Sequence, residues 1–325
     1  AASDVYKRQA RGYLESAGVL GLETPVERLQ HMNQPAYEFY LNRNPGIDLA
    51  ADRLEIGVCA QHNNGGIDVD LWWRSSIAGL FPVGEAAGAH GVARPGGAAL
   101  NSAQVGATRA AQWIAAREQG AARADEGWQE LAGDALQKAR SLLEAACGRE
   151  ESSGVLIDDV LMESTRAMSD NAGLVRSRQG LEELARNVAE WRRRVVDECV
   201  VDPTSRRSVD RLFLVRDILD VQAVYVAAML DHLDHGVGSR GSVLYTDPDG
   251  DLPVSWWNDG ADLDVEEIFR HRLDSKAHHG VTQRVSVDAV GEAIHAHWGP
   301  VRPIPTEDEF LENVWKTYRV DHNIH

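Results

Sequence analysis

Apolar residues recur every three or four positions through the middle of the chain, from about residue 128 to residue 233. This spacing places them on one face of an α-helix. Helices are predicted over 128–148, 155–173, 179–199 and 209–233. In the last of these, one stripe is formed by Leu212, Val215, Leu219, Val226, Leu230 and Leu233. Because other helices have to cover such a stripe, the pattern predicts a helical bundle.

Two short apolar runs come earlier, LEIGVCA at 54–60 and GLFPVG at 79–84. Short runs bounded by Gly, Asn and Pro are typical of buried strands, so both are predicted to be strands. Glycine-rich sequence follows each. After the second, an Ala-rich helix is predicted over 101–119, because it begins with Asn-Ser, two residues favoured as N-caps. The expected fold class is α/β followed by α, and the order strand, glycine loop, helix is typical of small-molecule sites.

The outer segments are less regular. Residues 25–48 mix short helical pieces with Pro and Asn-Pro breaks, and the sequence beyond Ser239 becomes acidic and Trp-rich. The tail EDEFLENVWKTYRV (307–320) is predicted to form a short amphipathic helix. The tryptophan pairs are interpreted as packing or interface residues; they are Trp72, Trp73, Trp256 and Trp257.

Length and charge narrow the class of protein. A chain of 325 residues exceeds what one core usually holds, so at least two packing units are expected. The net charge of −17 repels nucleic acid and anionic membrane surfaces alike. No stretch reaches the ~20 apolar residues of a membrane-spanning helix, and the N-terminus lacks a basic-then-apolar signal pattern. A cytoplasmic protein without a membrane span is therefore expected.

The cysteines and histidines give no sign of metal chemistry. Cys59, Cys147 and Cys199 are far apart and form no CxxC pair, so buried reduced thiols are expected. Seven histidines lie from His271 onward, but they lack cysteine partners and a clear ligand spacing. No metal site is predicted.

The glycine loop FPVGEAAGAHGVARPGGAALNS (81–102) allows close approach of backbone to a ligand. The predicted helix start near Asn101 presents free N–H groups that favour an anion or an electron-rich ring. Glu85 stands where a carboxylate can accept hydrogen bonds from sugar hydroxyls. A plain turn and a solvated loop carboxylate are the alternatives.

Two residues are candidates for holding a substrate. Arg94, stiffened by Pro95, suits bidentate capture of a carboxylate. His62 in QHNNGG ends the first predicted strand beside two glycines, and it suits carboxylate binding or proton transfer. A surface arginine and a structural histidine are the alternatives.

These segments resemble a known family. AQHNNGGI and GLFPVGEAAGAHGVARPGGAALNS are similar to the motifs H-x-x-G-G, G-L-[FY]-A-x-G-E and H-G-x-x-R-x-G-G-x-S-L of the succinate dehydrogenase and fumarate reductase flavoprotein family (FAD-dependent oxidoreductase 2). MSDNAGLVRSRQGLEEL (168–184) resembles its bundle motif, and LVRDILDVQAVYVAAMLDHLDHGVGSRGS resembles its last helix. The resemblance covers roughly residues 12–245.

The resemblance implies a domain order: the end of a capping domain at 1–53, the C-terminal part of a Rossmann-like FAD-binding domain at 54–122, a helical bundle at 123–245 and a C-terminal extension at 246–325. It implies FAD as cofactor, with hydride passing between flavin and a small carboxylate or enoate-type substrate. His62 and Arg94 would hold the substrate carboxylate. The implied cofactor-binding residues are Gly66, Glu85, Asn101, Ser102 and Ala103.

Two departures limit these expectations. RPGGAALNS has two more residues between its glycines and Asn-Ser than the family's RLGGNSL form, so no substrate is assigned. The chain shows no opening strand with G-x-G-x-x-G and no upstream proton-delivering arginine, so it is expected to be a C-terminal half that is inactive alone. The alternative hypothesis is a non-catalytic interaction module that docks an iron–sulfur or other electron-transfer subunit.

Overall fold

The computed structural model divides the chain into two compact units, Ala1–Cys59 and Ala60–His325. The predicted domain boundaries at 53/54, 122/123 and 245/246 stay predictions. The structure describes residues 11–18, 21–22, 24–52, 65–91, 94, 97–117, 127–149, 154–241, 243–254, 264–288, 293–301, 306, 316–317 and 320.

In the first unit, two short helices confirm the prediction of helical pieces between breaks. Helix α2 (Pro25–Met32) begins at Thr24, which forms a capping box with Glu27. Asn33 ends α2 and caps helix α3 (Gln34–Arg43) by accepting a hydrogen bond from the Ala36 N–H. Neither helix has a buried residue.

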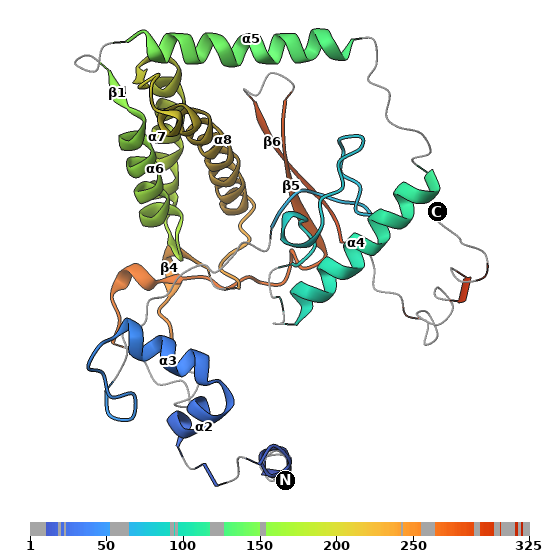
Figure 1. The fold of residues 1–325 in the computed structure, drawn as a ribbon, viewed down its shortest axis with the longest axis vertical. Coiled ribbons are helices and arrows are strands. Elements are labelled where there is room, and N and C mark those ends of the chain that lie inside the picture. Colours follow the sequence, from blue (N-terminus) through green and yellow to red (C-terminus); the bar gives the residue numbers. More distant parts are fainter. Residues whose placement is uncertain are drawn as a thin grey trace. The chain divides into compact units, whose positions relative to one another are not determined.

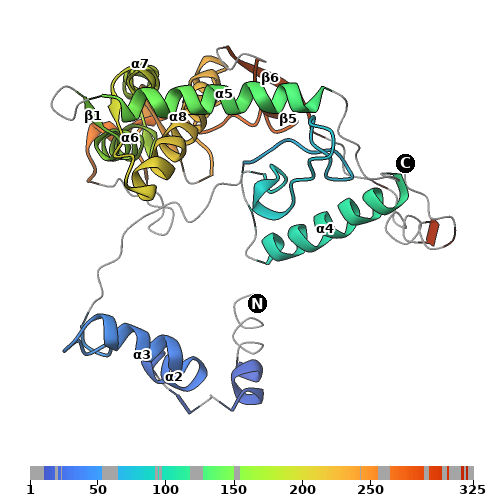
Figure 2. The same ribbon diagram turned by 45° about the horizontal axis from the view of Figure 1, so that its top comes forward.

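The second unit contains the predicted helical bundle. Its helices are α5 (Trp128–Cys147), α6 (Ile157–Ala172), α7 (Arg178–Asp197) and α8 (Arg206–Asp234). Helices α6, α7 and α8 lie side by side (Figures 1 and 2), with a shared apolar core that also receives Ala146 of α5. Leu212, Val215 and Leu219 are fully buried in this core. The apolar stripe predicted for the last helix is therefore confirmed.

Two short parallel strand pairs join the ends of the bundle helices. Strand β1 (Val155–Leu156) pairs with β3 (Cys199–Val200), and β2 (Val175–Arg176) pairs with β4 (Leu244–Asp251). The NAGLVR sequence (171–176) within the segment that resembles the family's bundle motif stabilises this junction, because Arg176 donates to the carbonyls of Ala172 and Gly173 and to the Tyr245 hydroxyl. This motif is therefore accounted for by packing in the structure.

Upstream of the bundle, helix α4 (Ala98–Arg117) packs against a short 3₁₀ turn, η1 (Gly84–Ala86). The prediction that this helix begins near Asn101 is wrong, because it begins three residues earlier. The strand predicted over 79–84 is also wrong: the structure shows irregular backbone at 79–83. In the described part of this region, the pairing is a single parallel bridge between Ile67 and Ala87. The strand predicted over 54–60 lies outside the described residues.

The C-terminal region holds a hairpin that was not predicted. Strands β5 (Val281–Val287) and β6 (Ile294–Pro300) are antiparallel, with Val281 opposite Pro300. The hairpin packs on α8, where Asp231 accepts hydrogen bonds from Gln283 (2.7 Å) and from the Trp298 indole (2.8 Å). Nearly all of the tail predicted to be helical lies outside the described residues.

The two described cysteines are free thiols, as expected. Cys199 is buried and Cys147 is half-buried, while Cys59 lies outside the described residues. Burial raises the pKa of the Cys199 thiol to about 11, so it stays protonated and unreactive at neutral pH. Within the described ranges, helices long and apolar enough to cross a bilayer are absent.

Candidate functional site

The candidate site is built where the η1 turn meets the first turns of α4. Gly84 opens η1 with a φ of +65°, a conformation that suits glycine. A Cβ on Gly84 would stand 3.5 Å from the Ala103 Cβ, so the turn lies directly against the helix. Glu85, the next residue, is exposed on this turn. Two of the predicted cofactor residues, Glu85 and Ala103, are thereby brought to one place.

Gly66 lies against the other side of the same turn. The Ile67 N–H donates to the Ala86 carbonyl and the Gly88 N–H donates to the Ile67 carbonyl, both at 2.9 Å. A Cβ on Gly66 would stand 2.6 Å from the Ala86 oxygen, so a side chain there would force these backbones apart. Packing alone accounts for glycine at this position, and its predicted contact with the cofactor stays a prediction.

The N-terminal end of α4 is where an anion would bind. The Asn101 N–H donates to the Gly97 carbonyl at 3.4 Å, which is the first helical hydrogen bond of α4 between described residues. The N–H groups of Ala98, Ala99 and Leu100 belong to the first turn of the helix, at the positive end of the helix dipole. At Gly97, a Cβ would meet no described atom within 4 Å. Gly97 itself is exposed at this end of the helix.

This helix start changes the roles expected for the Asn-Ser pair. Asn101 and Ser102 lie inside α4 rather than at its N-cap, and Asn101 is exposed while Ser102 is half-buried. The helix extends upstream because Ala98, Ala99 and Leu100 are strong helix formers. Their backbone amides thus replace those of Asn101 and Ser102 as the donors at the helix end.

The two residues predicted to hold substrate are not both described. Arg94 lies in the glycine loop, is half-buried and takes part in an interaction within the protein. His62 lies outside the described residues, so the predicted pairing of the two side chains stays a prediction.

A loop that sequence reasoning did not assign to the site holds the opposite part of α4. Residues 70–74, here called the tryptophan loop, form a tight turn around one carboxylate. Asp70 Oδ1 accepts from the N–H groups of Trp72 (2.8 Å) and Arg74 (3.0 Å), and Oδ2 accepts from Arg74 Nε (2.6 Å). Burial raises the pKa of Asp70, but these hydrogen bonds outweigh it and lower the pKa overall. The carboxylate is thus ionised at neutral pH and holds the loop closed.

Aromatic rings and arginines join this loop to α4. Trp72 is buried, and its ring lies 6.0 Å from that of Trp113. The Arg109 guanidinium stands 4.8 Å from the Trp72 ring centre, and that of Arg74 stands 4.0 Å from the Trp113 ring centre. Such cation–π contacts contribute about 0.5–2 kcal/mol each. The packing role expected for Trp72 is confirmed.

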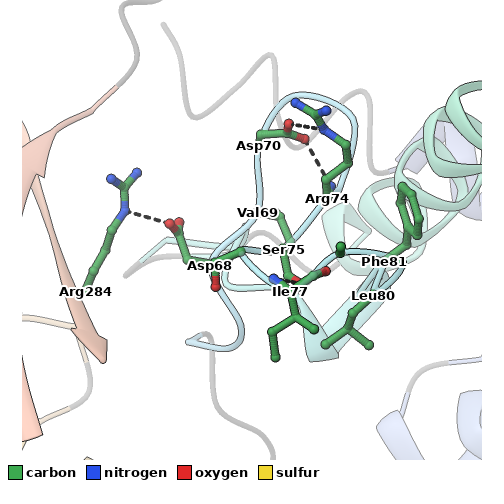
Figure 3. Close-up of a pocket in the computed structure, with 12 residues that line it drawn as sticks. Asp68, Val69, Asp70, Arg74, Ser75, Ile77, Leu80, Phe81 and Arg284 are labelled. Atoms are coloured by element: carbon green, nitrogen blue, oxygen red, sulfur yellow. Dashed lines mark hydrogen bonds and ion pairs between the residues drawn. The ribbon is translucent and has the colours of Figure 1, made fainter. Parts of the chain in front are cut away.

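A cavity of about 500 Å³ opens beside the tryptophan loop, as shown in Figure 3. Its walls are residues 68–70 and 74–81 together with Arg284 of β5. Arg284 pairs with Asp68 at 3.0 Å across the opening, and Arg74 turns toward Asp70. Both pairs are partly exposed, so they contribute little to stability. Among the predicted site residues that the structure describes, none lines this cavity.

Clusters of three or more His, Cys, Asp or Glu side chains arranged for a metal ion are absent from the part of the chain that the structure describes. Of the described histidines from His271 onward, several make other contacts. His297 hydrogen-bonds Ser286 at 2.9 Å, and His278 packs on Trp298.

Comparisons with known proteins agree with the resemblance seen in the motifs. One subunit of the fumarate reductase (CoM/CoB) of Methanothermobacter marburgensis is 39% identical over 66 residues, which cover 20% of this chain and 12% of that protein. The L-aspartate oxidase of Pyrococcus furiosus is 36% identical over 94 residues, which cover 28% of this chain and 20% of that protein. No family model matches the chain.

The fold also has solved relatives. The FrdA chain of E. coli quinol fumarate reductase superposes with a TM-score of 0.64 at 19% identity, over 87% of this chain and 44% of FrdA. The chain is therefore similar to succinate dehydrogenase/fumarate reductase flavoproteins, in short segments of sequence and in fold, as the motifs indicated. It spans less than half of the FrdA chain, and the aligned segments cover 12% and 20% of the two curated relatives.

Proposed function

We propose that this chain is part of an FAD-dependent oxidoreductase that acts on a small carboxylate or enoate-type substrate. The observation that carries the proposal is the packing of the Gly84–Ala86 turn on α4, which brings the turn that carries Glu85 against Ala103, in the second turn of that helix. The matched proteins, an aspartate oxidase and part of a fumarate reductase, support the reaction class by their names.

The residues at this end of α4 fit a flavin in chemical type. The N–H groups of Ala98, Ala99 and Leu100 would donate to an electron-rich ring edge, and the helix dipole would stabilise negative charge there. The Glu85 carboxylate would accept hydrogen bonds from the sugar-chain hydroxyls. Asn101, Ser102 and Ala103 would line the approach within the second turn of the helix. Bound FAD would supply the centre that gives or takes a hydride.

The chain's own part in the reaction is to hold and polarise the substrate. Arg94 would bind a substrate carboxylate through two parallel N–H donors, with fixed positive charge that favours electron density moving onto the substrate. His62 would hold the same carboxylate or exchange a proton with it. Fixing the substrate in this way removes orientational entropy from the reaction, a large part of many catalytic effects.

The partners follow from the same proposal. An oxidoreductase of this kind needs a second redox partner, and an iron–sulfur or other electron-transfer subunit is the candidate. The methanogen relative is named as one subunit of its enzyme, which supports a protein partner of this kind.

The proposal is tested by flavin chemistry in the gene product made from its full open reading frame. The purified protein should be yellow, should bleach on anaerobic reduction, and should regain its flavin absorbance when fumarate or another enoate is added as oxidant. A folded, colourless protein that takes up no added FAD would contradict the proposal. Flavin that bleaches but is reoxidised by no carboxylate would retain the cofactor and reject the substrate class.

A further inference from the structure

The tryptophan loop has a strained backbone at its centre. Trp73 has a φ of +57°, a left-handed conformation that is unusual for a bulky side chain and costs of the order of 1–3 kcal/mol. The hydrogen bonds of Asp70 to both neighbours, Trp72 and Arg74, hold the backbone in this form. The Trp73 N–H donates to the Asp70 carbonyl at 3.2 Å and closes the turn. The loop therefore holds Trp73 in an unfavourable backbone conformation, which fixes the direction of its indole.

The Trp73 indole packs directly on Gly106 of α4, where a side chain would collide with it. A Cβ on Gly106 would stand 2.5 Å from the Trp73 Nε1 atom and 2.7 Å from its Cε2 atom. Gly106 is buried in the middle of α4, where glycine is less favourable than alanine by about 0.5–1 kcal/mol. Glycine at this position is thus explained by close contact with Trp73.

The contact lies on the same face of α4 as the candidate site. Ala103 meets Gly84, and one turn further on Gly106 meets Trp73. Ala110 is buried on this face, and Trp113 packs on Trp72. The spacing of 3, 4 and 3 residues keeps all of these positions on one side of the helix. Two close contacts three residues apart, about 4.5 Å along the axis, fix both the rotation and the axial position of the helix.

We propose that Trp73 is a positioning residue for the flavin site. By seating on Gly106, it sets the axial position of α4, and thereby the distance between the amide end at Ala98 and the turn that carries Glu85. Trp73 acts through α4 and has no contact with the flavin itself. This inference rests on the proposed function, because the position that it sets is that of the cofactor.

The test compares two helical glycines in the full-length gene product. Gly106→Ala adds a methyl group that collides with Trp73, whereas Gly133→Ala in α5 adds one where no described atom lies within 4 Å. Both changes raise helix propensity equally, so Gly133→Ala is the matched control. We expect Gly106→Ala to weaken FAD binding about tenfold, equal to about 1.4 kcal/mol, and to change the visible circular dichroism of the flavin. Gly133→Ala should leave both unchanged.

A double variant separates this role from general destabilisation. Trp73→Gly suits the positive φ and removes the ring that the added methyl group of Gly106→Ala would meet, so the double variant should bind FAD like Trp73→Gly alone, without the two losses adding. If Gly106→Ala fails to fold, Trp73→Gly alone should still fold. It should bind FAD about tenfold more weakly than the wild type, because α4 has lost the Trp73 contact that fixes its position.

The outcomes distinguish the positioning role of Trp73 from the proposed function of the chain. A yellow wild type in which Gly106→Ala binds FAD like Gly133→Ala, or in which Trp73→Gly binds like the wild type, overturns the positioning role and leaves the proposed function standing. A wild type that binds no FAD overturns the proposed function, and the positioning role with it.

Discussion

Replacing Leu219 by alanine should reduce the free energy of unfolding of the bundle by about 2–5 kcal/mol, the range measured for buried leucines. Leu219 is 0% exposed and lies in the middle of α8, among residues of α6 and α7. The loss has two parts, the transfer free energy of the removed carbons and the cavity that close-packed neighbours cannot fill. Urea unfolding followed by far-UV circular dichroism measures it.

Val221, two residues further along the same helix, provides the control. It is 52% exposed, so Val221→Ala should change the free energy of unfolding by no more than about 0.5 kcal/mol. Equal effects at the two positions would mean that the face of α8 assigned to the core is the wrong one.

Replacing Arg94 by alanine should lower kcat/KM for the carboxylate substrate about 10²–10³-fold in the full-length protein, the range seen when one preorganised donor to a developing charge is removed. The flavin spectrum should stay unchanged, because Arg94 is proposed to bind substrate and not cofactor. Arg94→Lys should restore little, since an ammonium cannot form two parallel bonds to a carboxylate. Anaerobic reoxidation of the reduced flavin by fumarate, used as probe, gives the rates.

Arg206 is the matched control, because its side chain is 94% exposed on the first turn of α8 and pairs only at 3.7 Å with Asp210. Arg206→Ala should leave kcat/KM unchanged. A full rate in Arg94→Ala would remove this arginine from the substrate site. The same variant also separates an enzyme from a docking module, since a module would keep its partner subunit when Arg94 is lost.

The helical bundle is the part of the fold that the sequence predicts best. Helix spacing is a local signal, and long amphipathic runs such as that of α8 can pack in few ways. Observed bounds differ from the predicted ones by at most three residues, and two of the helices begin earlier than predicted because their caps, Ser177 and Ser205, lie just upstream of the apolar stripes.

The region of the candidate site was predicted less well, for identifiable reasons. Asn-Ser is a strong N-cap signal, but the helix-forming Ala98, Ala99 and Leu100 carry α4 past it to Gly97. The apolar run at 79–84 satisfies the strand pattern, yet Pro82 lacks an N–H and no extended partner pairs with it among the described residues. Pairing depends on distant segments, which a local pattern does not contain.

The motifs named candidate residues but not the framework that holds them. Gly66, Glu85 and Ala103 are brought to one turn, whereas the contact between Trp73 and Gly106 was not foreseen. A signal was present, because a glycine inside an Ala-rich helical run usually has a packing reason. The hairpin of β5 and β6 was also missed, although its alternating burial follows from the alternation of Val281, Gln283 and Val285 with more exposed neighbours.

The central claim is that a flavin ring lies against the amide end of α4. The most direct measurement is an experimental structure of the full-length protein with FAD bound. The account predicts an oxygen or nitrogen of the ring within about 3 Å of a backbone N–H of Ala98, Ala99 or Leu100, with the sugar chain beside Glu85. A flavin bound elsewhere, with this helix end facing solvent or another part of the protein, would contradict the account.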